Sequence, residues 1–395
     1  MSEFRTIREL CSVVVDCPHS TPKWTANGKI VIRNNNIKHG RIDFSSPSYT
    51  DDEHFAQRIK RAKPQPGDII ITREAPIGDV GMIPENTECC LGQRMVLLRA
   101  NQSVCDNFYL LYSLQSLYVQ HQISWSEGTG TTVSNLRIPH LEQIQIPYLP
   151  LEQQAKISSV LRALEEKIEN NRRLNDNLEQ QAQSYFQELF VDNASPEWTT
   201  GTISDLGTVV GGSTPSKAKP EYYTESGIAW ITPKDLSINK SKFVSHGEND
   251  ITELGLKNSS AVIMPEGTVL FSSRAPIGYI AIAAGEVTTN QGFKSVVPKP
   301  EIGTPFVYFF LKNTLPVIEG MASGSTFKEV SGSTMKNVPA VIPDAETLAK
   351  FSDFCAAIFA QQRTLEEQNQ SLAKLRDSLL PKLMSGEIDV SAVHL

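Results

Sequence analysis

The chain repeats itself once, and this duplication limits its fold more than any other feature of its 395 residues. Residues 66–71 (PGDIII) precede the tetrapeptide APIG at 75–78, and residues 266–271 (EGTVLF) precede the same tetrapeptide at 275–278. Matches that keep one order at a nearly constant offset indicate two copies of one structural unit. Two further pairs of matching positions are Ser20-Thr21-Pro22 with Ser213-Thr214-Pro215, and Gln93 with Gln291.

Each copy begins with a region that is typical of a mixed, mainly β domain. Short apolar runs rich in β-branched residues alternate with Gly, Pro and Asn, a pattern that predicts short strands joined by turns. The predicted strands lie at 28–32, 68–72 and 95–98 in the first copy, and at 262, 269–271 and 280–283 in the second. The segments 106–122 and 304–319 predict helices.

Each copy ends with a segment that predicts a long helix. No Gly or Pro occurs from Leu151 to Phe190 or from Glu346 to Leu380. Apolar residues recur in both at spacings of three and four, and in the second segment they include Leu365, Leu372, Leu375 and Leu379. Pro381 and Gly386 mark the end of the second helix. Polar residues on the apolar stripes either fix the register of a helix pair or lie in solvent where the helices diverge. They are Asn171, Asn175, Gln362 and Asn369.

These patterns predict an α+β fold with a pseudo-two-fold internal repeat. Neither apolar stripe is covered by its own neighbours in sequence, so we expect the two long helices to pair as an antiparallel coiled coil. Antiparallel pairing places the β-rich domains at opposite ends of a rod, an arrangement that suits a DNA duplex. The predicted segments are a first domain at 1–150, a central helix at 151–195, a second domain at 196–343, and a C-terminal helix and tail at 344–395.

The net charge of −7 argues against nucleic-acid binding by the chain as a whole. The excess is concentrated in the helical segments, each of which carries a net charge of −3. The two domains have net charges of 0 and −1, so each can still present a basic face. No apolar run reaches the ~20 residues of a membrane span, and the N-terminus lacks the apolar core of a signal peptide. Six cysteines without zinc-ligand spacing predict reduced thiols in a cytoplasmic protein.

Catalytic signatures are absent from the sequence. It contains no G-x-x-x-x-G-K-[ST] phosphate loop, no H-E-x-x-H and no G-x-S-x-G, and its seven histidines are scattered. We therefore expect a protein without catalytic or metal-binding residues. The run Gly128-Thr129-Gly130-Thr131-Thr132 and its counterpart Gly324-Ser325-Thr326 either offer backbone N–H groups to a phosphate or are ordinary turns.

Several segments together resemble the specificity subunits of type I DNA restriction-modification systems, over essentially the whole chain. The residues that carry the resemblance are the two APIG segments with their preceding strands, 91–94 (LGQR), 290–293 (NQGF), 146–154 (IPYLPLEQQ) and 379–388 (LLPKLMSGEI). The second copy departs from the pattern before its helix, with Asp344-Ala345-Glu346-Thr347 where the first has Leu151-Glu152-Gln153-Gln154.

The resemblance implies a function. Each β-rich region would be a target recognition domain that reads one half of a split, asymmetric site on double-stranded DNA. The helices would set the gap between the half-sites and dock two methyltransferase subunits, and motor-nuclease restriction subunits would join for cleavage. Those methyltransferase subunits would carry S-adenosylmethionine and flip the target adenine, so this chain would bind no cofactor itself.

Base readout requires Arg, Lys, Asn or Gln at base edges, and phosphate binding requires Lys, Arg and backbone N–H groups. In the first domain we predict DNA contacts from a strand-end run, from the densest basic run (58–63) and from nearby positions: Lys23, Arg33, Asn34, Asn35, Asn36, Lys60, Arg61, Arg73, Gln93 and Arg94. In the second domain the predicted contacts are Thr214, Lys217, Thr232, Lys234, Arg274, Gln291 and Lys294.

Structural alternatives remain open for these residues. The asparagine run also fits a plain turn, and the basic run also fits a solvated helix face. Gln93 and Gln291 fit a requirement of the shared fold as well as a base contact. Arg73 and Arg274 fit structural salt bridges as well as phosphate contacts, and their shift by one position relative to APIG indicates different roles. For the whole chain, the main alternative is a duplicated protein-binding adaptor with a rigid helical spacer, and a nucleic-acid-processing enzyme is the third.

Overall fold

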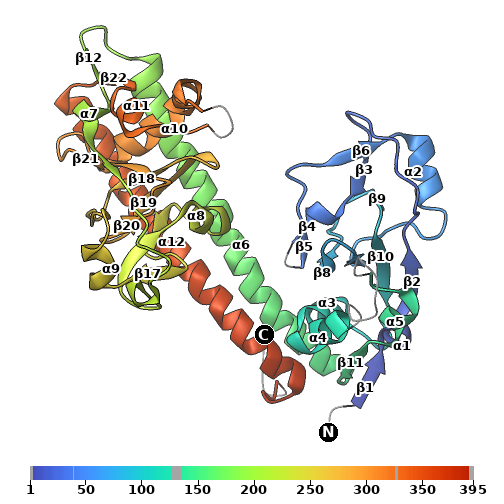
Figure 1. The fold of residues 1–395 in the computed structure, drawn as a ribbon. Helices are drawn as coiled ribbons and strands as arrows, with labels where there is room; N and C mark the ends of the chain where they lie inside the picture. Colours follow the sequence, from blue (N-terminus) through green and yellow to red (C-terminus); the bar gives the residue numbers. More distant parts are fainter. Residues whose placement is uncertain (1–2, 39, 126–134, 325–327, 391–395) are drawn as a thin grey trace. The chain divides into compact units, whose positions relative to one another are not determined.

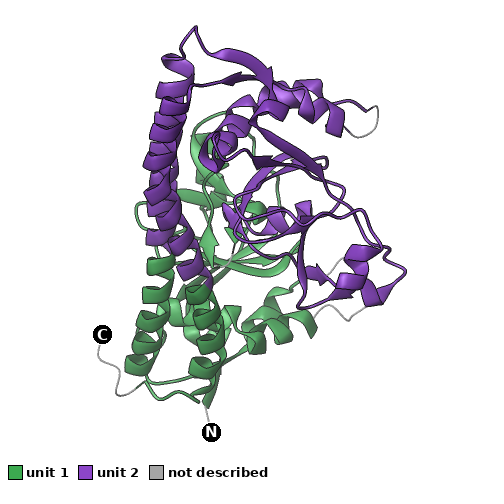
Figure 2. Ribbon diagram, turned by 90° about the vertical axis from the view of Figure 1, so that its left-hand side faces the viewer, with its two compact units in different colours: residues 1–168, 371–395 green, residues 169–370 purple. Residues whose placement is uncertain are grey.

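The computed structural model describes residues 3–38, 40–125, 135–324 and 328–390. The chain divides into two compact units. One unit contains residues 1–168 and 371–395, and the other contains residues 169–370 (Figure 2). Each unit therefore combines one β-rich domain with a section of both long helices. The four segments predicted from the sequence instead treat each long helix as separate from the domains.

The first domain is built on a four-stranded antiparallel sheet of order β2-β10-β7-β8. Its strands are β2 (Cys11–Asp16), β7 (Ile69–Arg73), β8 (Ile77–Met82) and β10 (Met95–Ala100). Smaller sheets are formed by β6 (Ser48–Thr50), β3 (Lys29–Ile32) and β9 (Cys89–Leu91), by β4 (Ile37–Lys38) and β5 (Arg41–Ile42), and by β1 (Glu3–Thr6) and β11 (Gln145–Tyr148). The helices are α1 (Ile7–Leu10), α2 (Asp52–Arg58), α3 (Asn107–Gln115), α4 (Leu117–Trp125) and α5 (Ile138–Gln143), with a 3-10 turn η1 (Asn34–Asn36) (Figure 1).

The second domain repeats this plan. Its main sheet has the order β13-β21-β18-β19-β16, with strands β13 (Gly207–Gly211), β16 (Phe243–Val244), β18 (Val269–Ser273), β19 (Ile277–Ala283) and β21 (Lys294–Pro298). Smaller sheets are formed by β14 (Tyr223–Thr224), β17 (Asn249–Ile251), β15 (Ile228–Ile231) and β20 (Thr288–Thr289), and by β12 (Thr199–Thr202) and β22 (Pro339–Ile342). The helices are α7 (Ile203–Leu206), α8 (Pro233–Ile238), α9 (Glu253–Lys257), α10 (Thr304–Met321) and α11 (Gly332–Lys336), with a 3-10 turn η4 (Pro220–Tyr222).

The two copies agree in detail as well as in plan. The parallel pair β3 and β9 of the first domain has its counterpart in the parallel pair β15 and β20 of the second. The Ala75-Pro76 and Ala275-Pro276 peptides are both cis. Thr72 and Ser272 play the same part, because the hydroxyl of each accepts the N–H seven residues later, at 2.9 and 2.8 Å. The duplication read from the sequence is therefore a duplication of structure.

The central strands β7, β10 and β18 are buried on both faces because their side chains alternate between two apolar layers. Ile69 and Ile71 of β7 face a core that includes α3 and the long helices, whereas Ile70 faces the small β3-β9 sheet. In the second domain Val269 and Phe271 face the helical core and Leu270 faces the opposite layer. One layer thus attaches each domain to the helices, and the other supports the loops at the strand ends.

The two long helices are α6 (Leu151–Gln187), which continues as a short π-helical segment (Glu188–Asp192), and α12 (Ala345–Ser385). In the first unit Ile157 and Leu161 of α6 share a core with Leu383 of α12. In the second unit Asn171, Asn175 and Glu179, in that order along α6, bond Gln368, Glu366 and Gln362, which follow in the reverse order along α12. Figure 1 shows α6 in green and α12 in red. Antiparallel packing of the helices is therefore present, as predicted.

The polar seam residues are internal contacts rather than solvated positions. Asn171 is 2% exposed and bonds Gln368 at 3.3 Å, and Gln362 is 1% exposed and bonds the Asn175 carbonyl oxygen at 3.2 Å. Oδ1 of Asn369 is buried without a hydrogen-bond partner among the residues that the structure describes. These contacts fix which residues of the two helices face each other in the second unit.

A buried lysine ties the second domain to both helices. Nζ of Lys242 lies 2.5 Å from a carboxylate oxygen of Glu179 on α6 and 2.7 Å from Oε1 of Gln362 on α12. The carboxylate of Glu366, also on α12, accepts the backbone N–H groups of Lys242 and Phe243 at 2.8 and 3.0 Å. Burial acts to raise the pKa of Glu179, but Lys242 and Lys312 outweigh it and hold that pKa below its ordinary value.

Four local predictions were wrong. The helix expected at 106–122 breaks at Ser116 into α3 and α4, and Val262, expected in a strand, lies exposed in a loop. Leu375, expected on the seam, is 46% exposed. Pro381 does not end α12, which continues to Ser385 and stops before Gly386 in the left-handed region (φ 75°). Glycine adopts that conformation at no steric cost, so it ends the helix where proline does not.

Within the described ranges, no helix is both long and apolar enough to cross a membrane. Over the same residues, no three His, Cys, Asp or Glu side chains gather as a metal site. All six cysteines are buried and free.

Candidate nucleic-acid interface

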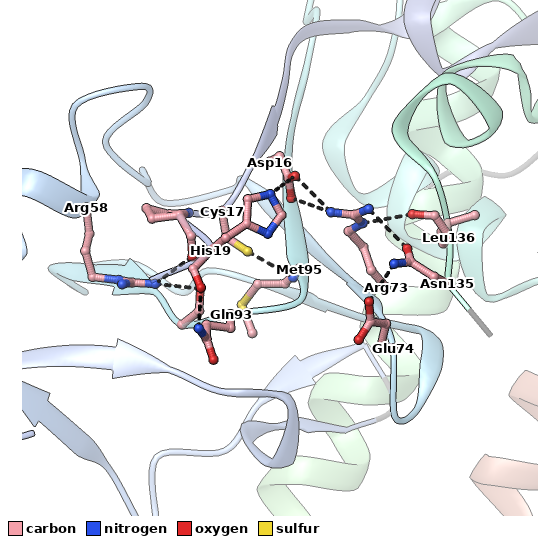
Figure 3. Close-up of polar contacts among 12 residues, drawn as sticks. Asp16, Cys17, His19, Arg58, Arg73, Glu74, Gln93, Met95, Asn135 and Leu136 are labelled. Carbon is pink, nitrogen blue, oxygen red and sulfur yellow. Dashed lines mark hydrogen bonds and ion pairs between the residues drawn. The ribbon is translucent and has the colours of Figure 1, made fainter. Parts of the chain in front are cut away.

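Most of the contact residues predicted in the first domain come together at one end of its sheets. We call this surface, formed by residues 16–24, 33–36, 73–76, 92–94 and 135–136, the first loop face. Nδ2 of Asn34 donates to the Glu74 carbonyl oxygen at 2.7 Å, and Arg94 lies 3.3 Å from the Glu74 carboxylate. The amide of Gln93 donates to the His19 carbonyl oxygen (Figure 3). Segments far apart in sequence therefore build one surface.

Arg73 lies beneath this face and is occupied by internal partners. Its Nη1 donates to both carboxylate oxygens of Asp16 at 2.9 and 2.8 Å, and its Nε donates to the Leu136 carbonyl oxygen at 2.8 Å (Figure 3). Nη2 donates to Oδ1 of Asn135 at 3.1 Å, and the side chain is 12% exposed. The geometry favours the structural salt bridge over the phosphate contact for this residue.

The basic run 58–63 divides into residues with different roles. Arg58 is buried and donates to the carbonyl oxygens of Pro18, Ser20, Leu91 and Gly92 at 2.7–3.3 Å, so it holds the first loop against the strand end. Burial lowers the pKa of Arg58. Lys60 and Arg61 are exposed and contact no acidic group among the described residues, so both are open to phosphate. Lys63 pairs with Glu88 at 2.8 Å.

The asparagine run forms a turn with one outward-facing amide. Asn36 is buried and bonds the Arg33 N–H and the Asp43 carbonyl oxygen at 2.9 and 3.0 Å. Asn35 is exposed, and the exposed Arg33 lies 5.3 Å above the ring of Trp24. Lys23, also exposed, lies 3.3 Å from Asp51. Asn36 thus shapes the turn, whereas Arg33 and Asn35 are available to a ligand.

The second loop face consists of residues 212–219, 231–235, 273–276, 290–294 and 328–330. Thr214 donates to Oε1 of Gln291, which joins the loop after β13 to the turn before β21. Thr232 caps α8, because its hydroxyl accepts the Asp235 N–H at 3.4 Å. Lys234 pairs with Glu248 at 2.6 Å, and Lys217 is exposed without an acidic partner among the described residues.

The arginines near the two APIG segments occupy different positions in the repeat. The backbone N–H of Arg73 donates to the Arg94 carbonyl oxygen at 2.8 Å, and that of Ser273 donates to the Gly292 carbonyl oxygen at 2.7 Å. Ser273 is therefore the counterpart of Arg73, and Arg274 is the counterpart of Glu74. Arg274 and Lys294 each lie 3.7 Å from the carboxylate of Glu329. The two faces therefore have equivalent backbone hydrogen bonds but place charged side chains at different positions.

Sequence reasoning did not identify the residues that organise these faces. Asp16, Glu74, Asn135 and Glu329 hold the basic side chains, and Trp24 lies under Arg33. Glu74 alone had a local signal, since it adjoins the APIG segment. Of the two glycine- and threonine-rich runs, residues 128–132 and 325–326 lie outside the described residues, so the phosphate-binding alternative there stays a prediction.

Comparison with known proteins identifies the family. The model of the type I restriction modification DNA specificity domain matches residues 3–180 and again 196–374. The specificity subunit of the type I restriction enzyme MjaIX from Methanocaldococcus jannaschii is 38% identical over 192 residues, which are 48% of this chain and 44% of that protein. The specificity subunit of HindI from Haemophilus influenzae is 27% identical over 194 residues, which are 48% and 42% of the two chains. Each alignment thus spans less than half of the relative.

A solved structure supports the fold over nearly the whole chain. The crystal structure of the type I restriction-modification system S subunit from M. genitalium matches with a TM-score of 0.61 at 19% identity, covering 97% of this chain and 96% of that one. The family model matches both copies of the repeat and most of the sequence. The chain therefore belongs to the family defined by the type I restriction modification DNA specificity domain.

Proposed function

We propose that this chain is the sequence-reading subunit of a type I restriction-modification complex, in which each domain binds one half of a split, asymmetric site on double-stranded DNA. One observation carries the proposal: in a chain whose two copies both match the specificity domain, each copy gathers basic and amide side chains on one loop face. Two equivalent faces on one chain are what recognition of a two-part site requires.

The chemistry of the exposed residues supports this proposal. Guanidinium groups pair with guanine and amides with adenine at the edges of bases in the major groove. Arg33, Asn35 and Arg94 present such groups on the first loop face, and Arg274 on the second. Lys60, Arg61 and Lys217 are suited to phosphates. Residues with internal partners, such as Asn36 and Thr232, would act by holding the loops.

The long helices supply the remaining part of the proposal. Paired antiparallel, they would separate the half-sites by a fixed gap and dock two methyltransferase subunits, which bring S-adenosylmethionine, and motor-nuclease subunits for cleavage. This chain would contribute recognition and no catalysis, would bind no cofactor, and would work in the cytoplasm. Because it is a subunit, its affinity for DNA is expected to be highest in the complex.

Salt-titrated DNA binding of the chain with its methyltransferase partner tests the proposal. We expect the logarithm of the association constant to fall by about 0.9 per tenfold increase in salt for each phosphate neutralised. The variant K60A/R61A should lower that slope by about one to two, whereas K257A on α9, which pairs with Glu253 within its own helix, should not. A salt-independent response would favour the protein-binding adaptor. Methylation or cleavage by the chain alone would contradict the non-catalytic role.

A further inference from the structure

Arg94 adopts a backbone conformation that an arginine rarely adopts. Its φ angle is 65°, in the left-handed region, whereas the equivalent position of the second copy is Gly292. A side chain at such an angle is unfavourable, and residues held this way gather at functional sites. Gly292 does not adopt a left-handed φ angle, so the repeated fold does not by itself require the conformation seen at Arg94. The fold therefore does not explain the presence of an arginine at position 94, and a function of its side chain does.

The Arg94 side chain is held by one edge and leaves its other edge open. Its Nε lies 3.3 Å from Oε2 of Glu74, and Oε1 of Glu74 accepts from Nδ2 of Asn135 at 2.6 Å. The arginine side chain is 57% exposed, and neither terminal nitrogen has a partner among the described residues. These two nitrogens form the fork with which arginine makes paired hydrogen bonds. Glu74 therefore contacts the Nε edge of Arg94, and the two terminal nitrogens of this exposed side chain are left for a ligand.

The second domain presents a comparable pair from different positions. Arg274 stands where the first copy has Glu74, and 38% of its side chain is exposed. Its Nη1 lies 3.7 Å from the carboxylate of Glu329, so this contact is made by a terminal nitrogen and not by Nε as in Arg94. Glu329 stands where the first copy has Asn135. The residues that follow them show this equivalence. The backbone N–H of Leu136 donates to the Arg73 carbonyl oxygen at 3.0 Å, and that of Val330 donates to the Ser273 carbonyl oxygen at 2.9 Å.

A carboxylate beside the arginine distinguishes base readout from phosphate binding. Glu74 would repel a phosphate that approached Arg94, so this arginine is poorly placed as a phosphate contact. Glu329 acts in the same direction on Arg274 but more weakly, because Lys294 also lies 3.7 Å from its carboxylate. A neutral base edge has no such penalty, and guanine offers O6 and N7 to the two terminal nitrogens of one arginine. The cytosine of the same pair offers its N4 amino group, which a carboxylate can accept. An arginine with an adjacent carboxylate thus matches both bases of one G·C pair.

We infer that Arg94 with Glu74, and Arg274 with Glu329, each read one G·C base pair, the first in the half-site of the first domain and the second in that of the second domain. This inference rests on the proposed function and assigns specific residues to it. The loop that contains the cis proline supplies the acceptor, Glu74, in the first domain and the donor, Arg274, in the second. The two half-sites therefore differ in which base of the pair that loop contacts.

The test is a base-resolution map of modified adenines in cells that express the full chain with its methyltransferase partner. R94G introduces the residue that the second copy carries, so it relieves the backbone conformation while removing the fork. R94K keeps the charge but loses the paired geometry. The matched control is R8A, since Arg8 on α1 pairs with Glu142 at the same 3.3 Å and with similar exposure, 64% and 26%, but lies at the opposite end of β2.

We expect R94G and R94K each to reduce discrimination at one G·C position of one half-site by about ten- to hundredfold, with the other half-site unchanged. R274K should do the same in the other half-site, and R8A should leave the motif intact. An unchanged motif in both variants, a uniform loss across all sequences, or a wild-type motif without a G·C pair in each half-site would overturn the inference. Absence of sequence-specific methylation by the wild-type complex would instead contradict the proposed function.

Discussion

The Thr214 hydroxyl donates a hydrogen bond to Oε1 of Gln291, and the equivalent residues of the first copy, Thr21 and Gln93, also meet, with 3.4 Å between Oγ1 and Nε2. In each domain this contact joins the loop after the first strand of the main sheet to the turn before the last. The recurrence of the glutamine is thus explained by a shared loop contact, one of the two interpretations that the sequence left open. Its amide positions the loop that presents the basic residues.

Removing this contact should loosen the loop without unfolding the domain. We expect Q291A to speed amide hydrogen exchange at residues 213–217 and to weaken DNA binding, because the loop opens more often without this contact. The domain should stay folded, since one net hydrogen bond contributes only about 0.5–1.5 kcal/mol to stability. The control Q57A removes an exposed glutamine whose side chain bonds Glu53 within α2 at 3.4 Å, and it should change neither property. Unchanged exchange in Q291A would show that the loop is held by other contacts.

The Lys242 cluster should behave as one coupled unit. K242M leaves the carboxylate of Glu179 buried with fewer partners, and loss of one member of a buried ion pair costs about 3–5 kcal/mol. The double variant K242M/E179M should lose much less than the sum of the two single variants, since it removes both charges. Urea unfolding of all four proteins measures this difference. Additive losses would contradict a coupled anchor.

Acid should weaken the start of α12 through Asp344. The Thr347 N–H, 2.9 Å from its carboxylate, lowers the pKa of Asp344 to about 2, with help from the Thr347 hydroxyl and Trp198. A pKa that folding lowers from 3.8 stabilises the native state fully from about pH 5 upward, and that contribution disappears as the pH falls through 3.8 towards 2.

We therefore expect wild type and D344A to differ in unfolding free energy by a constant amount above pH 5 and by progressively less below pH 4. D344N retains an uncharged cap oxygen, so its difference from D344A should not follow this titration. Thermal unfolding between pH 2 and 7 measures both differences. A difference between wild type and D344A that stays constant down to pH 2 would contradict the assignment of the cap.

Lengthening both helices should lengthen the gap between the half-sites. A heptad inserted after residue 168 in α6, with a matching heptad after residue 370 in α12, adds about 10.5 Å to the pair, or about three base pairs of DNA. We expect the modified motif to keep both half-sites and gain about three unread positions. A heptad in only one helix disrupts the antiparallel register and should reduce methylation. An unchanged gap in the matched variant would contradict the role of the helices as a spacer.

The sequence predicted the repeated and periodic parts of this fold because they depend on local patterns. The paired APIG segments identified equivalent strands, and the spacing of apolar residues identified α6 and α12. Val262 was wrongly placed in a strand because a single β-branched residue in a short apolar stretch shows no periodicity, and periodicity is the signal that separates buried from exposed positions. Leu375 continues the apolar spacing but is 46% exposed, which the spacing alone does not reveal.

The candidate interface was less accessible from the sequence because its residues act through partners far along the chain. Arg58 belongs to the densest basic run, yet it binds carbonyl oxygens more than thirty residues away and is buried. The shift of Arg73 and Arg274 relative to their APIG segments indicated different roles, but only the hydrogen-bond register shows which partners each arginine has. Only the folded structure shows which basic side chains have internal hydrogen-bond partners and which are left to contact DNA.

The most direct test of the account is the map of modified adenines in cells that express the unaltered chain and its methyltransferase partner, compared with cells that express the partner alone. Two loop faces on one chain predict a two-part, asymmetric motif with a fixed unread gap, which disappears when this chain is omitted. A continuous motif, or the same motif without this chain, would contradict the claim that its two domains read the two halves of one DNA site.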